Sequence, residues 1–226
     1  LMQRRLEALL ADCGYAWPQP GRRLGLAALA EALGVLPHLL RGQISQELTR
    51  IVWGAPQMAQ DFRYAMIALL EARLAEEETP LETAVMAWLC GDLRRVGEVR
   101  AANIGARVSR HSARAMLISL CHWVRSCGGQ GMLVLLDIRQ LLRDRRTVEQ
   151  GVVYTPAAVM DCYEVLRQTI DDTERFEGVF FAVLADPSLL DEESRRGLSQ
   201  YTGLKMRVWD DVRPQGQDNM LAPLVV

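Results

Sequence analysis

Two short apolar segments that each end on an aspartate constrain the fold of this chain more than any other feature. MLVLLD covers residues 132–137, and GVFFAVLAD covers residues 178–186. A near-continuous apolar run of this length is typical of a buried strand in a parallel sheet. A helical pattern lies between the two segments, and the order strand–helix–strand favours a crossover between parallel strands. The sequence therefore predicts an α/β arrangement with both strands buried.

The aspartates that close these strands, Asp137 and Asp186, indicate a binding site. Ligands of open α/β sheets collect beyond the carboxyl ends of the strands, and carboxylates at adjacent strand ends can share a magnesium ion and its waters. A simpler interpretation stays open. Aspartate is also favoured where a strand turns into a helix, so each residue would then only start a turn or cap the next helix.

The pattern before residue 125 is helical, and the pattern after residue 128 alternates between strands and helices. Apolar residues recur at helical spacing in the first half, with a helix cap predicted at Asp61, a break or bend near Gly42 and a helix start at Thr79-Pro80. In the second half Thr155-Pro156 opens a long helix, and KMRVW (205–209) and LAPLVV (221–226) are further strand candidates. We therefore expect a mostly helical region at residues 1–112 and an α/β portion at residues 113–226.

Composition excludes several classes of protein. The formal net charge of −2 gives no global attraction to nucleic acid, and no apolar run approaches the ~20 residues that span a bilayer. The three histidines have no matching nucleophile and acid that would form a catalytic triad. An odd number of cysteines without a C-x-x-C pair favours reduced thiols in a cytoplasmic protein over disulfides or a zinc site. The cysteines are Cys13, Cys90, Cys121, Cys127 and Cys162.

Three blocks of the second half carry a family likeness: YEVLRQTIDDT (163–173), VLADPSLLD (183–191) and LKMRVWDDVR (204–213). In these blocks the chain resembles the bacterial ATP-binding proteins found with BREX-type phage-defence loci, which are P-loop ATPases. The resemblance runs from roughly Arg107 to the C-terminus. It implies a helical N-terminal region followed by a parallel-sheet P-loop NTPase-like core, with ATP and magnesium as ligands.

The resemblance also implies roles for single residues. Asp137 would end the Walker B strand and orient magnesium through water, and Asp186 would lie near the γ-phosphate. Arg207 and Arg213 are candidates for contacts to the nucleotide of a neighbouring subunit, because a guanidinium can bind phosphate through two hydrogen bonds. Surface ion pairs with the two aspartates between these arginines are the simpler interpretation.

Two departures from the family pattern put hydrolysis in doubt. Ile138 stands where active hydrolases usually place a glutamate that activates water, and the nearest glutamates downstream are Glu149 and Glu164. The chain also has no G-x-x-x-x-G-K-[ST] motif (Walker A), and GRRLGLAALA (21–30) fits better as a loop before a helix. We expect the phosphate-binding loop upstream of Leu1, and nucleotide binding with weak or no hydrolysis.

The expected partners are other proteins of a defence assembly, such as a helicase, together with further copies of the chain and no membrane. The alternative function is a non-catalytic protein-interaction module with an NTPase-like fold. DNA is a third partner to consider, because phosphate contacts need arrayed cations. A solvated or partner-facing segment explains the same arginines. They are Arg94, Arg95, Arg100, Arg107, Arg110 and Arg114.

Overall fold

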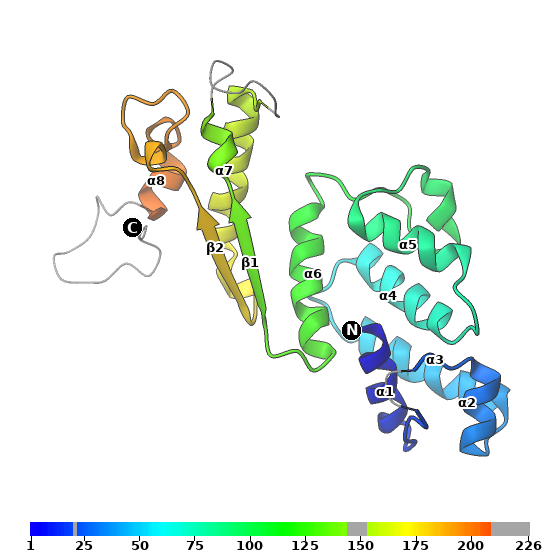
Figure 1. Ribbon diagram of the computed structural model, residues 1–226. Helices are drawn as coiled ribbons and strands as arrows, with labels where there is room; N and C mark the ends of the chain where they lie inside the picture. The colour runs from blue at the N-terminus through cyan, green and yellow to red at the C-terminus, as the bar shows by residue number, and fades with distance from the viewer. Residues whose placement is uncertain (20–21, 144–152, 209–226) are drawn as a thin grey trace. The chain divides into compact units, whose positions relative to one another are not determined.

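The structure is a computed structural model in which residues 1–19, 22–143 and 153–208 are described. The chain divides into two compact units, Leu1–Met132 and Leu133–Val226 (Figure 1). The boundary expected from the sequence, between residues 112 and 113, lies before the last helix of the first unit. That helix stays with the first unit because its Trp123 and Cys127 are buried in the same core as the earlier helices.

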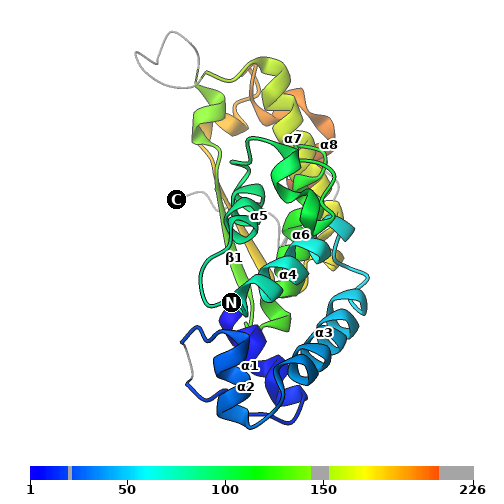
Figure 2. The ribbon, with the colours of Figure 1, turned by 90° about the vertical axis from the view of Figure 1, so that its right-hand side faces the viewer.

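The described residues of the first unit form helices joined by loops. In chain order these are α1 (Met2–Asp12), α2 (Leu26–Leu33), α3 (Pro37–Trp53), α4 (Gln60–Arg73), α5 (Pro80–Cys90), the 3-10 helix η1 (Val96–Ala102) and α6 (Ala113–Ser126). α1, α2 and α3 pack together in both views of Figures 1 and 2. The helical first region predicted from the sequence is confirmed.

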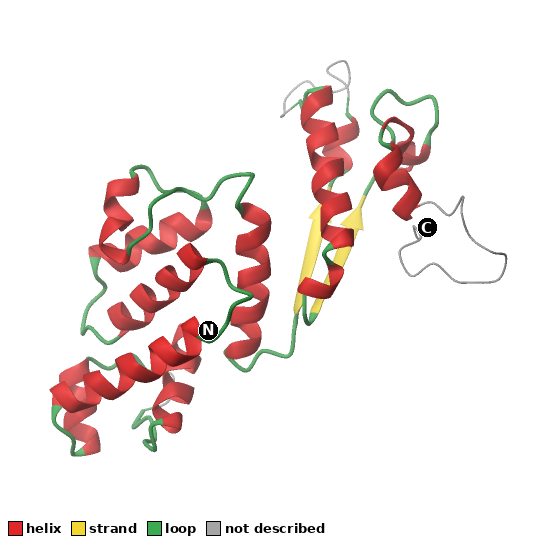
Figure 3. Cartoon of the chain, turned by 180° about the vertical axis from the view of Figure 1, so that it is seen from behind, coloured by secondary structure: helices red, strands yellow, loops and turns green. Residues whose placement is uncertain are grey.

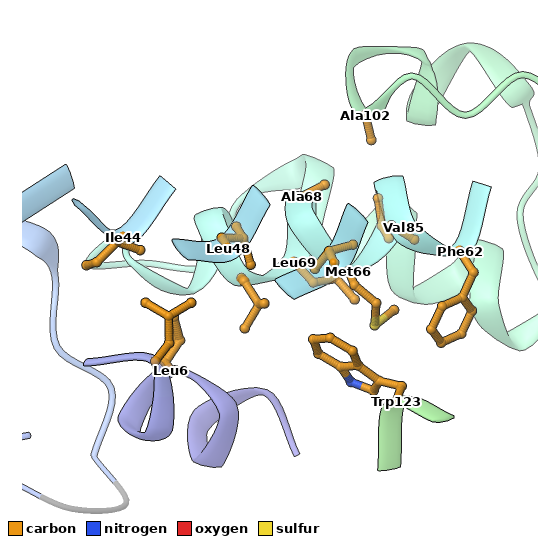
Figure 4. Close-up of a cluster of buried hydrophobic side chains, with 14 of the residues drawn as sticks. Leu6, Ile44, Leu48, Phe62, Met66, Ala68, Leu69, Val85, Ala102 and Trp123 are labelled. Carbon is orange, nitrogen blue, oxygen red and sulfur yellow. The ribbon is translucent and has the colours of Figure 1, made fainter. Parts of the chain in front are cut away.

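One apolar core joins α1, α3, α4, α5 and α6. Figure 4 shows side chains of these helices converging, with the Trp123 ring next to Met66 and Phe62. Phe62 and Met66 are four residues apart and therefore lie on the same side of α4. Burial of one stripe per helix is the reason that the amphipathic pattern of the sequence predicted these elements well.

Local signals fix the ends of several helices. The Thr79 hydroxyl accepts a hydrogen bond from the Glu82 N–H, and Pro80 occupies the first turn, so the predicted start of α5 is confirmed. Gly91 ends α5 with φ of 80°, in the left-handed region that favours glycine.

Two details of the helical prediction are wrong. The capping position of α4 is Ala59, whose N–H donates to Ser119 Oγ at 2.8 Å, and Asp61 lies in the first turn instead. There its charge still interacts favourably with the helix dipole. The helix has no break at Gly42, because α3 runs without interruption from Pro37 to Trp53. Buried residues hold α3 on both sides of this glycine. They are Leu40, Ile44, Leu48 and Val52.

A buried carboxylate ties three parts of the first unit together. Glu82, on α5, is 8% exposed, and its Oε2 lies 3.0 Å from Arg23 Nη2 while Oε1 lies 3.3 Å from Arg73 Nη1. Arg23 also donates to the carbonyl oxygens of Ala72 at 2.8 Å and Ala75 at 3.0 Å, near the end of α4. Arg23, in the loop that the sequence predicted before α2, is therefore held in this network.

The second unit contains a two-stranded sheet in its described residues. Its elements are β1 (Met132–Asp137), η2 (Arg139–Leu142), α7 (Pro156–Asp171), η4 (Thr173–Arg175), β2 (Val179–Leu184), η5 (Pro187–Leu190), η6 (Leu198–Gln200) and α8 (Thr202–Val208). The strands are parallel (Figure 1), and α7, which connects them, lies across one face of the sheet (Figure 3). The Ile138 N–H donates to the Leu184 carbonyl at 2.8 Å and continues the pairing past β1.

The expectation that both strands are buried is wrong for one face of this sheet. Leu133, Leu135 and Phe180 expose 68%, 59% and 68% of their surface. On the other face, Leu136 and Ile138 pack into a core with residues of α7. Consecutive apolar residues show that a segment is a strand, but they do not show which of its faces is covered.

The third predicted strand is also wrong. Residues 205–208 of this segment lie in the helix α8. This helix packs along α7, and its Leu204 is buried. A segment this short takes its conformation from packing more than from its own strand propensity. The other strand candidate, LAPLVV, lies outside the described residues.

Replacing Glu82 by glutamine should destabilise the first unit by about 3 kcal/mol, because removing one partner of a buried ion pair leaves uncompensated charge. The free energy of unfolding from urea titration measures this loss. The matched control is Glu31→Gln, an exposed position on α2, where we expect a change within about 0.5 kcal/mol. Equal stability of the two variants would contradict the role given to Glu82.

Candidate functional site

The structure brings Asp137 and Asp186 to the same edge of the sheet. Asp137 is the last residue of β1, and Asp186 follows β2 by two residues. Because β1 and β2 are neighbouring parallel strands, their carboxyl ends lie at one edge. Hydrogen bonds from Arg139 and Ser188 are the main causes of the lowered pKa of Asp137 and Asp186 respectively, and the positive charge of Arg143 adds the smallest contribution at each.

Asp137 is held by its own neighbour, Arg139. The Arg139 guanidinium donates from Nε to Oδ1 at 2.9 Å and from Nη2 to Oδ2 at 2.6 Å, and the Arg139 backbone N–H donates to Oδ1 at 3.1 Å. These bonds favour the charged carboxylate and lower the pKa of Asp137 from the ordinary 3.8 to about 2. The side-chain bonds from Arg139 contribute most, and the backbone N–H comes next. Both side chains are well exposed to solvent.

Asp186 caps the short helix η5. Its Oδ1 accepts a hydrogen bond from the Ser188 N–H at 3.0 Å and another from Ser188 Oγ at 2.7 Å. The hydroxyl bond is the largest cause of the lowered pKa of Asp186, followed by the backbone bond. The local contacts of both aspartates are therefore those of turn and cap residues. Both carboxylates nevertheless remain charged and exposed at the strand ends.

Sequence reasoning missed the residue that ties together the loops at this edge, Arg196. Its Nη1 donates to the carbonyl oxygens of Leu141 at 3.2 Å and Arg143 at 2.9 Å, both in the segment after β1. The Tyr163 hydroxyl of α7 in turn donates to the Arg196 carbonyl. In the sequence, Arg196 is marked only by its neighbour Arg195. Two adjacent arginines are also common in an exposed loop, so the pair alone did not indicate a structural role.

The other residues singled out for nucleotide chemistry lie elsewhere or are already engaged. Ile138 is 7% exposed and belongs to the core beneath the sheet. Glu164 accepts hydrogen bonds from Arg167 and Tyr201 between α7 and α8, which lower its pKa, with the bond from Arg167 contributing most. The Glu164 carboxylate is therefore committed to these hydrogen bonds. Glu149 lies outside the described residues.

Of the two arginines considered for contact with a neighbour's nucleotide, Arg207 and Arg213, the structure describes only Arg207. Arg207 forms an ion pair with Asp171 of α7, and its Nη1 donates to the Gly203 carbonyl at 2.6 Å. It therefore supports the packing of α8 on α7 within the unit. Arg213 lies outside the described residues, as do the aspartates at 210 and 211.

The oxygen groups at the strand ends fit a magnesium ion that also binds phosphate. Magnesium in nucleotide sites is bound through one or two carboxylates and keeps several waters and phosphate oxygens. Asp137 and Asp186 would offer two carboxylates to such an ion, directly or through water. Among the residues that the structure describes, no group of three or more His, Cys, Asp or Glu gathers as a metal cage. Water and phosphate would therefore have to complete the coordination.

The exposed arginines Arg94, Arg95, Arg100 and Arg107 lie in the first unit, around η1. In the described part of the chain these four side chains form no ion pair. Arg110 and Arg114, which complete the predicted set, follow in the approach to α6 and have interactions of their own. The cysteines of the chain are all free thiols.

A comparison with protein families identifies the class of this chain. The model of the family described as BREX system ATP-binding protein BrxC/D matches residues 36–226. The chain belongs to this family of ATP-binding proteins of the BREX defence system. The match begins at the start of α3, so the family includes most of the helical unit as well as the blocks after Arg107. Neither the curated proteins nor the solved structures gave a match.

Nothing in the described helices has the length and apolar character needed to cross a membrane.

Replacing Arg139 by alanine should raise the pKa of Asp137 from about 2 toward the ordinary 3.8. The carboxyl carbon shift in an NMR titration reports this pKa. Because the pKa is lower in the folded than in the unfolded chain, the pairing stabilises the fold above pH 3.8, and this contribution is lost as the pH falls through about 2.

The control is Arg175→Ala, which removes an arginine paired with Asp172 near the start of β2. It should leave the Asp137 titration unchanged. If the pKa of Asp137 stays near 2 in Arg139→Ala, the ion pair does not cause the shift.

Proposed function

We propose that this chain binds ATP with magnesium at the strand ends of its second unit and works in a cytoplasmic anti-phage defence assembly. One observation carries the proposal: two neighbouring parallel strands end on Asp137 and Asp186 in a chain of an ATP-binding family. In the proposed site Asp137 orients the magnesium through water, in the manner of a Walker B aspartate. Asp186 lies toward the terminal phosphate.

Binding requires Asp137 to exchange partners. Its carboxylate is occupied by Arg139, so the ion pair has to open before a hydrated cation can take its place. The cost of opening is small, because exposed ion pairs contribute only about 0–1 kcal/mol to stability. The released Arg139 and the nearby Arg143 would then face phosphate oxygens, which guanidinium groups bind well.

The same residues favour a binding state over rapid hydrolysis. The residue after Asp137 is aliphatic and buried, and it cannot accept a proton from water. Glu164 is engaged in the α7–α8 contact through Arg167 and Tyr201. We therefore propose that the bound nucleotide organises contacts with other defence proteins or with further copies of the chain, and that turnover is slow or absent.

A non-catalytic interaction module is the second candidate function. The capping contacts of Asp137 and Asp186 favour it, since they account for both carboxylates without a ligand. The exposed apolar face of the sheet also favours it, because large apolar side chains grouped on a surface mark contacts with other proteins. The two candidates differ in whether magnesium and ATP bind at all.

Isothermal calorimetry with magnesium and a non-hydrolysable ATP analogue tests the proposal. We expect magnesium-dependent binding, weakened about tenfold or more by Asp137→Asn, since groups that orient a metal through water contribute at this level. Glu174→Gln is the matched control, because this exposed carboxylate of η4 precedes β2 and lies away from the carboxyl ends of the strands. It should bind like the wild type.

An absence of any heat of binding with the wild-type chain would contradict nucleotide binding and favour the interaction module. The melting temperature should then also be the same with and without magnesium and ATP. Equal affinity of Asp137→Asn and Glu174→Gln for the analogue would contradict the role given to Asp137.

A further inference from the structure

The residues 93–107, here called the arginine segment, rest on a well-packed base in the first unit. Val99 and Ile104 are fully buried in the main core. The indole N–H of Trp88, on α5, donates to the Ala106 carbonyl at 2.7 Å. The buried side chains of Val99 and Ile104 and this hydrogen bond hold the backbone of the segment in place. The Cα atoms of its exposed residues are therefore held in place as well.

The geometry of η1 separates the buried side chains of the segment from the exposed ones. A 3-10 helix has three residues per turn, so residues three apart lie on one side. One row contains Val99 and Ala102, which are buried in the core, and Val96, which is half-buried. Figure 4 shows Ala102 at the edge of this core. A second row is exposed and consists of Gly97, Arg100 and Asn103.

The exposed surface of the segment is cationic and has small side chains between its charges. The segment contains one carboxylate, Glu98, and Asp92 directly precedes the segment. Four exposed arginines outnumber these two acids and form no ion pair in the described part of the chain. These arginines are Arg94, Arg95, Arg100 and Arg107. Gly97 and Gly105 have open space where a side chain would lie, which lets a ligand approach the backbone closely.

We propose that the arginine segment binds the phosphate backbone of duplex DNA without reading its sequence. Protein–DNA interfaces are polar and strongly positive, whereas the centres of protein–protein interfaces are apolar. None of the large exposed apolar side chains among the described residues lies in this segment. The segment also has no aromatic residue on which unpaired bases could stack, which favours a duplex over a single strand.

This inference is independent of the proposed nucleotide site. The arginine segment belongs to the first unit, and the strand-end aspartates belong to the second. DNA binding can therefore be measured in the absence of nucleotide, and its failure leaves the calorimetric test of ATP binding unaffected.

Fluorescence anisotropy of a labelled mixed-sequence duplex tests the inference on the full chain. The test variant replaces the four arginines of the segment by glutamine. The control replaces four exposed arginines elsewhere in the first and second units, and so has the same net charge. These are Arg4, Arg22, Arg41 and Arg195. Circular dichroism melting should show that both variants fold like the wild type, because the replaced side chains are exposed.

We expect the wild type and the control to bind with an affinity that falls steeply with salt. The segment variant should bind at least tenfold more weakly, and its log–log salt slope should be smaller by roughly 3–4, about 0.9 for each lost phosphate contact. Equal affinity of the segment variant and the control would overturn the inference. So would wild-type binding that is insensitive to salt, or an absence of binding. Displacement of the DNA by single strands at equal concentration would overturn the preference for a duplex.

Discussion

The parallel pairing of β1 with β2 is the constraint on which the candidate site depends. Parallel strands need a crossover connection, which α7 supplies, and they place both carboxyl ends at one edge. Asp137 and Asp186 both lie at that edge although 48 residues separate them in sequence. The buried Tyr163 of α7 and the guanidinium of Arg196 then tie the two loops beyond the strands. The site is therefore a consequence of strand direction first and of local contacts second.

One face of the sheet is apolar and exposed in the described part of the second unit. Parallel sheets are almost always covered on both faces, and two strands alone give marginal stability. In the second unit α7 covers one face, whereas Leu133, Leu135 and Phe180 are exposed on the other. By strand alternation the Asp137 side chain lies on the same face as Leu133 and Leu135. The apolar face and the carboxylate of Asp137 therefore share one side of the sheet.

The sequence predicted what depends on periodicity and missed what depends on long-range packing. Helical stripes and the Thr79-Pro80 signal placed the first unit well, because one buried face per helix leaves a clear pattern. The runs MLVLLD and GVFFAVLAD predicted the strands, but an unbroken apolar run conceals which face is covered. Residues 205–208 became part of α8 because Leu204 packs against α7 and Arg207 pairs with Asp171. Contacts between residues this far apart in the chain leave no periodic signal.

The candidate site was predicted as a pair of aspartates, and their common edge follows from the sheet. Their partners were harder to foresee. The ion pair of Asp137 with Arg139 spans two residues and could have been read from the sequence, whereas the role of Arg196 required the loops to be placed. The family match supports ATP as the ligand, and the shared site at the strand ends is our proposal.

Paramagnetic relaxation with manganese in place of magnesium tests that shared site most directly. With Mn²⁺ and ATP bound, the account predicts that the backbone amide NMR signals of residues 137–139 and 186–188 broaden together. The amide signals of η4 (Thr173–Arg175), which precedes β2 in the same unit, serve as the reference for non-specific broadening. Broadening at only one strand end, or equal broadening across the whole chain, would contradict the claim that the two aspartates share one cation and nucleotide.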